Sequence, residues 1–228
     1  EVSNGNYRTD DVVVEVTEEP SAASHDEVFL SYMSNVRTKY STIKTLLYND
    51  QPKPFYDFYV CNNITWRERV EGQLSEISRF IFITGAGGLG KSMMMRHLLL
   101  NSIDNYKEFK LIPVFISLKD FDNTSGKLFD YIFTKIGDFD SEITKADFAH
   151  ALAAGRCLLL FDGLDEIGMN NVGFFERQLS SFTDRFPANC YVISSRPYQS
   201  FVSFERFSVL RLLPFSLDQA LHLVDNLD

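Results

Sequence analysis

The sequence has few of the features that would mark a secreted, membrane-spanning or nucleic-acid-binding protein. Its three cysteines, Cys61, Cys157 and Cys190, are far apart and odd in number, so we interpret them as small core residues in a reducing compartment. The longest apolar runs have five or six residues, whereas a membrane span needs about 20. Lysine and arginine are scattered singly or in pairs, without the clustering that favours nucleic acid. We therefore expect a cytoplasmic protein with no membrane contact and no direct nucleic-acid binding.

The sequence also shows neither histidines at metal-binding spacing nor a targeting segment. The four histidines stand at positions 25, 97, 150 and 222, and none has a partner at metal-ligand spacing, so we predict no zinc site. The start shows no signal peptide and no methionine, and the end falls inside a helical pattern. We expect the chain to be a fragment of a longer protein.

The negative charge of the chain is concentrated at its start. The formal net charge is -9, but residues 1–28 hold eight acids and one base, so the remainder is nearly neutral. A possible strand covers 11–16, and apolar residues recur every three or four positions over 25–49, which predicts an amphipathic helix. We predict an acidic N-terminal segment with a linker helix over 1–54 and one large domain over 55–228.

The rest of the chain alternates short apolar runs with helical patterns. The runs are near-continuously hydrophobic, as in parallel strands that are covered on both faces. They lie at 79–84, 111–118, 157–162, 191–195 and 207–213. Helices are predicted near 66–78, 91–103, 125–136, 145–154, 172–185 and 216–227, after an extended aromatic stretch at 51–60. This alternation predicts an α/β three-layer sandwich with a mostly parallel five-stranded sheet, preceded by a small helical segment.

A phosphate-binding loop stands between the first of these strands and its helix. The stretch GAGGLGKS at 85–92 matches GxxxxGK[ST] in full. Its glycines let backbone N–H groups converge on phosphate oxygens, Lys91 can reach the β and γ phosphates, and the Ser92 hydroxyl can bind Mg²⁺. The predicted nucleotide-binding residues of the loop are Gly85, Ala86, Gly87, Gly88, Leu89, Gly90, Lys91, Ser92 and Met93.

Three acids and an arginine follow two later strands. Asp162 ends the apolar run at 157–162, where a residue that orders Mg²⁺ is expected in an open α/β sheet. Asp165 and Glu166 follow on the next loop, close enough to polarise a water for attack on the γ phosphate, and we favour Asp165 for this role. Arg196, just after the strand at 191–195, can contact the γ phosphate. We predict Asp165, Glu166 and Arg196 as catalytic residues.

The base of the nucleotide is predicted to be adenine. TKAD at 144–147 and DEIG at 165–168 match the guanine-reading and DxxG motifs of GTPases, but they occur in reversed order along the chain. TKAD also begins a predicted helix, with Thr144 as a plausible N-cap. We treat both matches as chance and expect ATP or ADP with Mg²⁺.

Taken in order, GAGGLGKS, SLKDF at 117–121, LLLFDGLDEI at 158–167 and SSRP at 194–197 resemble the NACHT branch of the STAND nucleotide-binding switches. The most specific element is DGLDE, in which two acids follow the Mg²⁺ aspartate after a small and an apolar residue. Lys119 departs from the arginine that many members carry there, so its role is open. The resemblance implies that Tyr59 and Val60 contact the adenine. It also implies that the strand before Arg196 lies between the strands of the phosphate loop and of Asp162, with the strand at 111–118 at an edge.

The resemblance implies a slowly hydrolysing ATP switch. Its nucleotide state would control homo-oligomerisation and the activity of attached effector and sensor parts outside this chain, in antiviral or innate immune defence of the kind found in bacterial members. One alternative is a P-loop kinase that phosphorylates a small metabolite, although no arginine-bearing lid is evident after the acids. Another is an ATPase stimulated by nucleic acid, although no basic groove or array of stacking aromatics is evident.

Overall fold

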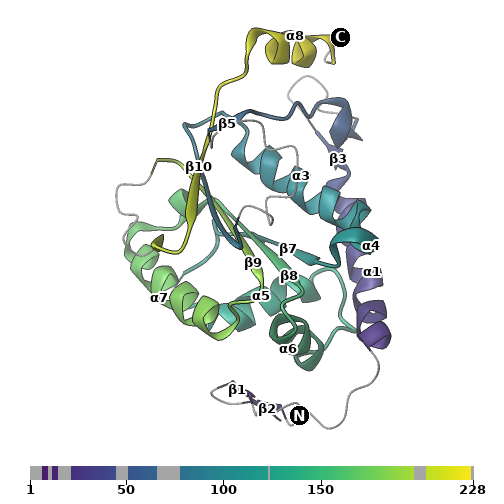
Figure 1. Ribbon diagram of the computed structural model, residues 1–228, viewed down its shortest axis with the longest axis vertical. Coiled ribbons are helices and arrows are strands. Elements are labelled where there is room, and N and C mark those ends of the chain that lie inside the picture. The colour runs from purple at the N-terminus through teal and green to yellow at the C-terminus, as the bar shows by residue number, and fades with distance from the viewer. Residues whose placement is uncertain are drawn as a thin grey trace.

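One twisted sheet with helices on both faces forms the body of the protein. The computed structural model describes residues 7–9, 12–14, 22–44, 51–65, 78–122, 124–197 and 204–226. Helices α1 and α3 lie on one face of the sheet and α5 and α7 on the other (Figure 1), which gives the predicted three-layer α/β sandwich. Within the described residues, no helix combines the length and the apolar character that crossing a bilayer requires.

The described elements follow the predicted alternation. The strands are β1 (Tyr7–Thr9), β2 (Val12–Val14), β3 (Thr42–Ile43), β4 (Lys53–Pro54), β5 (Ile64–Thr65), β6 (Phe80–Thr84), β7 (Ile112–Ser117), β8 (Cys157–Asp162), β9 (Cys190–Ser195) and β10 (Ser208–Leu212). The helices are α1 (Ala22–Tyr40), α3 (Lys91–Asp104), α4 (Tyr106–Phe109), α5 (Leu128–Gly137), α6 (Lys145–Ala153), α7 (Met169–Arg185) and α8 (Leu217–Asp225), with 3₁₀ turns η1 (Phe55–Asp57) and η2 (Leu164–Glu166).

The main sheet has the strand order β5-β10-β6-β9-β8-β7. Its last five strands run parallel to one another, as predicted, and the two-residue strand β5 adds an antiparallel partner to β10. The strand β9 lies between β6 and β8, and β7 lies at an edge, so the expected order is confirmed. Pro113 on β7 lacks an N–H, which an edge strand tolerates, and its carbonyl accepts a hydrogen bond from the Tyr32 hydroxyl at 3.2 Å.

The core lies between this sheet and its helices because the central strands are apolar on both faces. All six residues of β9 are buried, and five of the six residues of β8 are buried. The helix α1 packs into the same core through Phe29, Tyr32, Met33 and Val36. The amphipathic pattern at 25–49 therefore identified a helix that covers the sheet, whereas the division of the chain at residue 54 stays a prediction.

The helix predicted over 25–49 is shorter in the structure and ends at Tyr40. The β-branched residues Thr42 and Ile43 pair with Lys53 and Pro54 in a small antiparallel ladder instead. Arg96 of α3 stabilises this ending, because its Nε donates to the Tyr40 carbonyl at 2.6 Å, which is one of the carbonyls that a helix end leaves without an intrahelical partner. The long-range contact with Arg96 explains why local periodicity placed the helix end too late.

Three further predictions have different outcomes. The stretch at 51–60 is not extended throughout, because it forms the 3₁₀ turn η1 after Pro54. The helix predicted near 66–78 falls on residues 66–77, outside the described part of the chain. The N-cap prediction at Thr144 is confirmed, since its side chain accepts from the Asp147 N–H and the Asp147 carboxylate accepts from the Thr144 N–H. TKAD is thus a capping box.

Candidate functional site

The phosphate loop follows β6 directly and leads into α3. Gly88 and Gly90 have φ values of 81° and 86°, in the left-handed region that favours glycine, so the loop can curl back over the start of the helix. Gly90 is the N-cap residue of α3, and its carbonyl accepts from the Met94 N–H at 2.9 Å. The amides of the first turn of α3 therefore face the loop, which is the arrangement that favours anions.

Lys91 lies over its own loop. Its ammonium donates to the carbonyls of Gly85 at 2.7 Å and Ala86 at 3.0 Å. Burial lowers the pKa of Lys91, and the nearby negative charge of Asp165 opposes that shift. The charges of Asp162, Glu166 and Arg196 act on Lys91 as well. The predicted site residues from three separate stretches of chain are thus brought together around one ammonium group.

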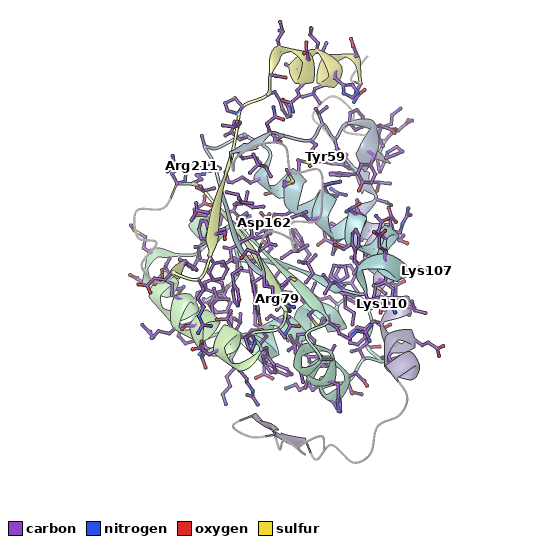
Figure 2. All side chains as sticks on the ribbon, in the orientation of Figure 1. Tyr59, Arg79, Lys107, Lys110, Asp162 and Arg211 are labelled. Carbon is purple, nitrogen blue, oxygen red and sulfur yellow. The ribbon has the colours of Figure 1, made fainter. Side chains whose placement is uncertain are left out.

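Asp162 is the last residue of β8 and lies at the carboxyl end of the parallel strands, where the phosphate loop follows β6. In Figure 2 it lies near the upper end of the sheet, below Tyr59, whereas Arg79, which precedes β6, lies at the opposite end. One carboxylate oxygen, Oδ1, accepts a hydrogen bond from the Ser194 hydroxyl. The same hydroxyl accepts the Gly163 N–H at 2.9 Å. Ser194 was not among the predicted site residues, because its contact depends on the register between β8 and β9.

Asp165 is bound to Arg196 through both of its carboxylate oxygens. The Arg196 backbone N–H donates to Oδ1 at 2.8 Å, and the Arg196 Nε forms an ion pair with Oδ2 at an N–O distance of 3.0 Å. The guanidinium group also lies beside Gly87 of the phosphate loop, 3.7 Å from the place where a Cβ would stand. The loop after β8 and the end of β9 are therefore joined next to the phosphate loop.

Glu166 has a different environment from Asp165. It ends the 3₁₀ turn η2, whose N-cap residue Gly163 has a φ of 83°. The Glu166 carboxyl group lies back over that glycine, with its Cδ 3.1 Å from the place where a Cβ of Gly163 would stand. Glycine at this position thus leaves room for the Glu166 side chain.

A cavity of about 230 Å³ lies beside the phosphate loop. The segment before the loop and the helix α8 form its walls, which are mostly apolar. The lining residues are Phe58, Tyr59, Val60, Asn62, Gly88, Leu89, Gly90, Met93, Phe215 and Leu223. The cavity includes the two predicted base contacts, Tyr59 and Val60, although the contacts themselves stay a prediction. Phe215 and Leu223 had no motif to identify them, because they reach the cavity only through the fold.

Tyr59 is held firmly in this wall. Its ring stacks on Phe55 with a centroid distance of 5.1 Å and on His97 with a centroid distance of 4.7 Å, each at an interplanar angle of 20°. Its hydroxyl donates to the Met94 sulfur at 3.4 Å. Stacking on two neighbouring rings leaves less of the faces of Tyr59 free, so we expect a base in the cavity to meet the ring edge or backbone of this residue.

Hydrogen bonds hold the start of α8 against the segment that follows Tyr59. The Leu213 N–H donates to the Asn63 carbonyl at 2.9 Å, and the Asn62 side chain donates to the Leu213 carbonyl at 3.2 Å. The Gln219 amide, which also caps α8, donates to the Cys61 carbonyl at 2.6 Å. These bonds place the C-terminal wall of the cavity over the phosphate loop.

Two of the predicted site residues carry oxygen donors of the kind that Mg²⁺ prefers. Asp162 and Ser92 offer a carboxylate and a hydroxyl, the hard oxygen ligands that Mg²⁺ prefers, and Mg²⁺ commonly completes its shell with phosphate oxygens and water. Among the residues that the structure describes, no group of three or more histidine, cysteine, aspartate or glutamate side chains could hold a metal ion. The residues present therefore fit an ion that arrives with a nucleotide.

Comparison with known proteins identifies one family and finds similar solved structures. A model of the NACHT domain matches residues 79–227, inside the large domain predicted from the sequence. No curated protein matches the chain. Among solved structures, the structure of C. elegans PCH-2 matches with a TM-score of 0.37 and 16% sequence identity, covering 86% of this chain and 44% of that chain. The chain thus spans less than half the length of PCH-2.

Proposed function

The chain belongs to the NACHT domain family, and we propose that it binds ATP with Mg²⁺, hydrolyses it slowly and uses the bound nucleotide as a switch. The observation that carries this proposal is the meeting of four groups at one end of the sheet. Lys91, Asp162, Asp165 and Arg196 come from three stretches of chain, and the charges of the other three all act on the Lys91 ammonium. Phosphate, metal and a reporting arginine can meet at such a site.

The phosphate chain would lie along the loop and the first turn of α3. On binding, Lys91 exchanges the carbonyls of Gly85 and Ala86 for phosphate oxygens, which are charged and therefore stronger acceptors. Ser92 and Asp162 would hold Mg²⁺ beside the phosphates. When bound, the ion neutralises the charge that develops on the phosphate oxygens during transfer.

We assign the hydrolytic water to Glu166 and not to Asp165, which the sequence alone had led us to favour. Oδ1 of Asp165 accepts a hydrogen bond from the Arg196 backbone N–H, and Oδ2 forms an ion pair with the Arg196 side chain. The backbone bond does not depend on where the guanidinium group points, so this carboxylate stays tied to Arg196 even if the side chain turns to a phosphate. Glu166 lies on the same turn, with its carboxyl group over Gly163, and its charge acts on the Lys91 ammonium. It can orient a water and take its proton.

Adenine fits the cavity better than guanine does. The walls are mostly apolar, and among the described lining residues there is one side-chain amide, that of Asn62, and no carboxylate to read the guanine edge. The guanine-like motif TKAD caps α6, which packs against α1 and lies at the end of the molecule away from α8 (Figure 1). We therefore propose ATP and ADP as the ligands, with Tyr59 and Val60 beside the base.

The switch itself would use the pair of Asp165 and Arg196. In this arrangement Arg196 is held by the carboxylate, whereas a γ phosphate next to Gly87 would compete for the same guanidinium group. Arg196 would then have two alternative anionic partners, the Asp165 carboxylate and the γ phosphate. ATP and ADP would therefore favour different positions of Arg196, which is what a nucleotide-dependent conformational change requires. We propose that the intact protein uses this change to control homo-oligomerisation and attached effector and sensor parts, in the cytoplasm and in antiviral or innate immune defence. Size measurement of the intact protein with ADP and with a slowly hydrolysed ATP analogue tests the assembly step.

The site assignment is tested by Lys91→Ala, with Lys107→Ala as the matched control. Lys107 lies on α4, away from Asp162 in Figure 2. Losing charge-assisted bonds to phosphate costs about 1.5–3 kcal/mol, so calorimetry should find ATP bound about 10- to 100-fold more weakly by Lys91→Ala and unchanged by Lys107→Ala. Equal affinity in wild type and Lys91→Ala would reject the site.

A further inference from the structure

Two neighbouring serines end β9, and their surroundings differ. Ser194 and Ser195 are 1% and 0% exposed. Successive side chains of a strand point to opposite faces of the sheet, so the two hydroxyls lie on different sides. The Ser194 hydroxyl accepts the Gly163 N–H and donates to Asp162. Within the described residues, the Ser195 hydroxyl has no hydrogen-bond partner.

The register of the sheet places Ser194 beside Asp162. Phe161 pairs with Ile193 in the parallel ladder of β8 and β9, so the next residues of the two strands lie side by side on the same face of the sheet. At Gly163 the chain adopts a φ of 83°, which side-chain-bearing residues rarely do. This turn directs the Gly163 N–H at the Ser194 oxygen, 2.9 Å away.

The bond to Gly163 also decides where the Ser194 proton goes. A serine hydroxyl has one proton and two acceptor lone pairs. The serine oxygen accepts the Gly163 N–H, and the hydroxyl proton is donated to Oδ1 of Asp162. Because the serine is buried and bonded on both sides, it holds the carboxylate in one orientation before any ligand arrives.

We infer that Ser194 is a positioning residue for the Mg²⁺ site, acting through Asp162. The inference rests on the proposed function, because it takes Asp162 as the residue that orders the ion. Hydrogen-bond partners of metal-ligating carboxylates commonly change metal affinity by about 10- to 100-fold when they are removed. Ser194 thus sets the Mg²⁺ requirement of nucleotide binding without touching the nucleotide.

The experiment compares Ser194→Ala with Ser195→Ala, which removes the same atom from the next residue on the opposite face. For each protein the affinity for ATPγS is measured by calorimetry in EDTA and then over a MgCl₂ titration. In Ser194→Ala we expect the metal-free affinity to stay within about twofold of wild type, while the Mg²⁺ concentration for half-maximal enhancement rises about tenfold or more. In Ser195→Ala both values should stay unchanged.

Two further variants separate positioning from folding. Ser194→Thr keeps the hydroxyl and should return the Mg²⁺ requirement to within about threefold of wild type. Ser194→Cys keeps nearly the same shape with a weak donor, so it should raise the requirement while remaining folded even if Ser194→Ala does not.

Three outcomes would overturn the inference. The first is a Mg²⁺ requirement that stays at the wild-type value in folded Ser194→Ala and Ser194→Cys. The second is an equal change in Ser194→Ala and Ser195→Ala, which would show a general packing effect. The third is a wild-type protein that binds ATPγS without any Mg²⁺ enhancement, which would reject the role of Asp162. Failure of wild type to bind ATPγS at all would instead reject the proposed function, so the two failures are distinguishable.

Discussion

Replacing Asp165 and Glu166 by their amides should separate the residue that orients the water from the residue that holds the arginine. Glu166→Gln keeps the shape of the side chain over Gly163 but removes its basicity. General bases typically contribute a factor of about 10²–10⁴ to rate, so hydrolysis should fall by that factor. The melting temperature should stay unchanged, because the substitution alters no packing.

Asp165→Asn should have a smaller effect on hydrolysis. An asparagine oxygen can still accept from the Arg196 backbone N–H, but asparagine carries no charge to pair with the guanidinium group, so the ion pair is lost. The Arg196 side chain is 66% exposed and that of Asp165 is 23% exposed, and solvent screening limits such a pair to about 1 kcal/mol or less. The melting temperature should therefore fall by less than about 4 °C, and hydrolysis should fall by about tenfold or less.

Single-turnover release of phosphate at saturating Mg²⁺ and ATP measures both effects, with thermal unfolding followed by circular dichroism. The matched control is Glu108→Gln on α4, which should leave both measurements unchanged. A Glu166→Gln protein with wild-type turnover, together with an inactive Asp165→Asn protein, would refute the assignment and return the water to Asp165.

Three other substitutions give independent tests. Asn189 is fully buried and makes three hydrogen bonds to backbone groups of α6, of β8 and of the residue directly after α7, so Asn189→Ala should lower the free energy of unfolding by about 3 kcal/mol in urea titrations. Burial lowers the pKa of His97 below its ordinary value of 6.5. The unfolded chain therefore binds more protons than the folded one at acidic pH, and the free energy of unfolding should fall as the pH drops below 6.5. In His97→Phe, unfolding curves measured at several pH values should show a weaker dependence of this free energy on pH. Gly163→Ala meets a φ of 83° and a Cδ of Glu166 at 3.1 Å, so it should cost about 1–2 kcal/mol in unfolding and also reduce hydrolysis.

The parallel sheet and the phosphate loop were predictable because their signals are local. Buried parallel strands require continuous apolar residues, and the strands β6 to β10 agree with the predicted runs to within one residue at each end. The loop at 85–92 depends on the backbone freedom of its own glycines and on the helix that follows. The end of α1 was not predictable in the same way, because Arg96, 56 positions away, binds its last carbonyl.

In the candidate site, too, some features follow from local signals in the sequence and others from long-range contacts. Residue type and spacing alone led to the prediction of Lys91, Asp162 and Arg196 as site residues, since a phosphate loop and an aspartate at a strand end have recognisable surroundings in the chain itself. The contacts within the site come from the tertiary structure: the register of β8 and β9 places Ser194 on Asp162, and the turn after β8 brings Asp165 to Arg196.

What the sequence determined by itself is the fold class, the phosphate loop and the presence of three acids and an arginine at strand ends, because each rests on the conformational preferences of neighbouring residues. Only the tertiary structure decided which acid binds Arg196, which serine supports Asp162 and which residues of α8 close the cavity. Those choices depend on hydrogen bonds and contacts between residues that are distant in the chain, and no local pattern carries the register that brings them together.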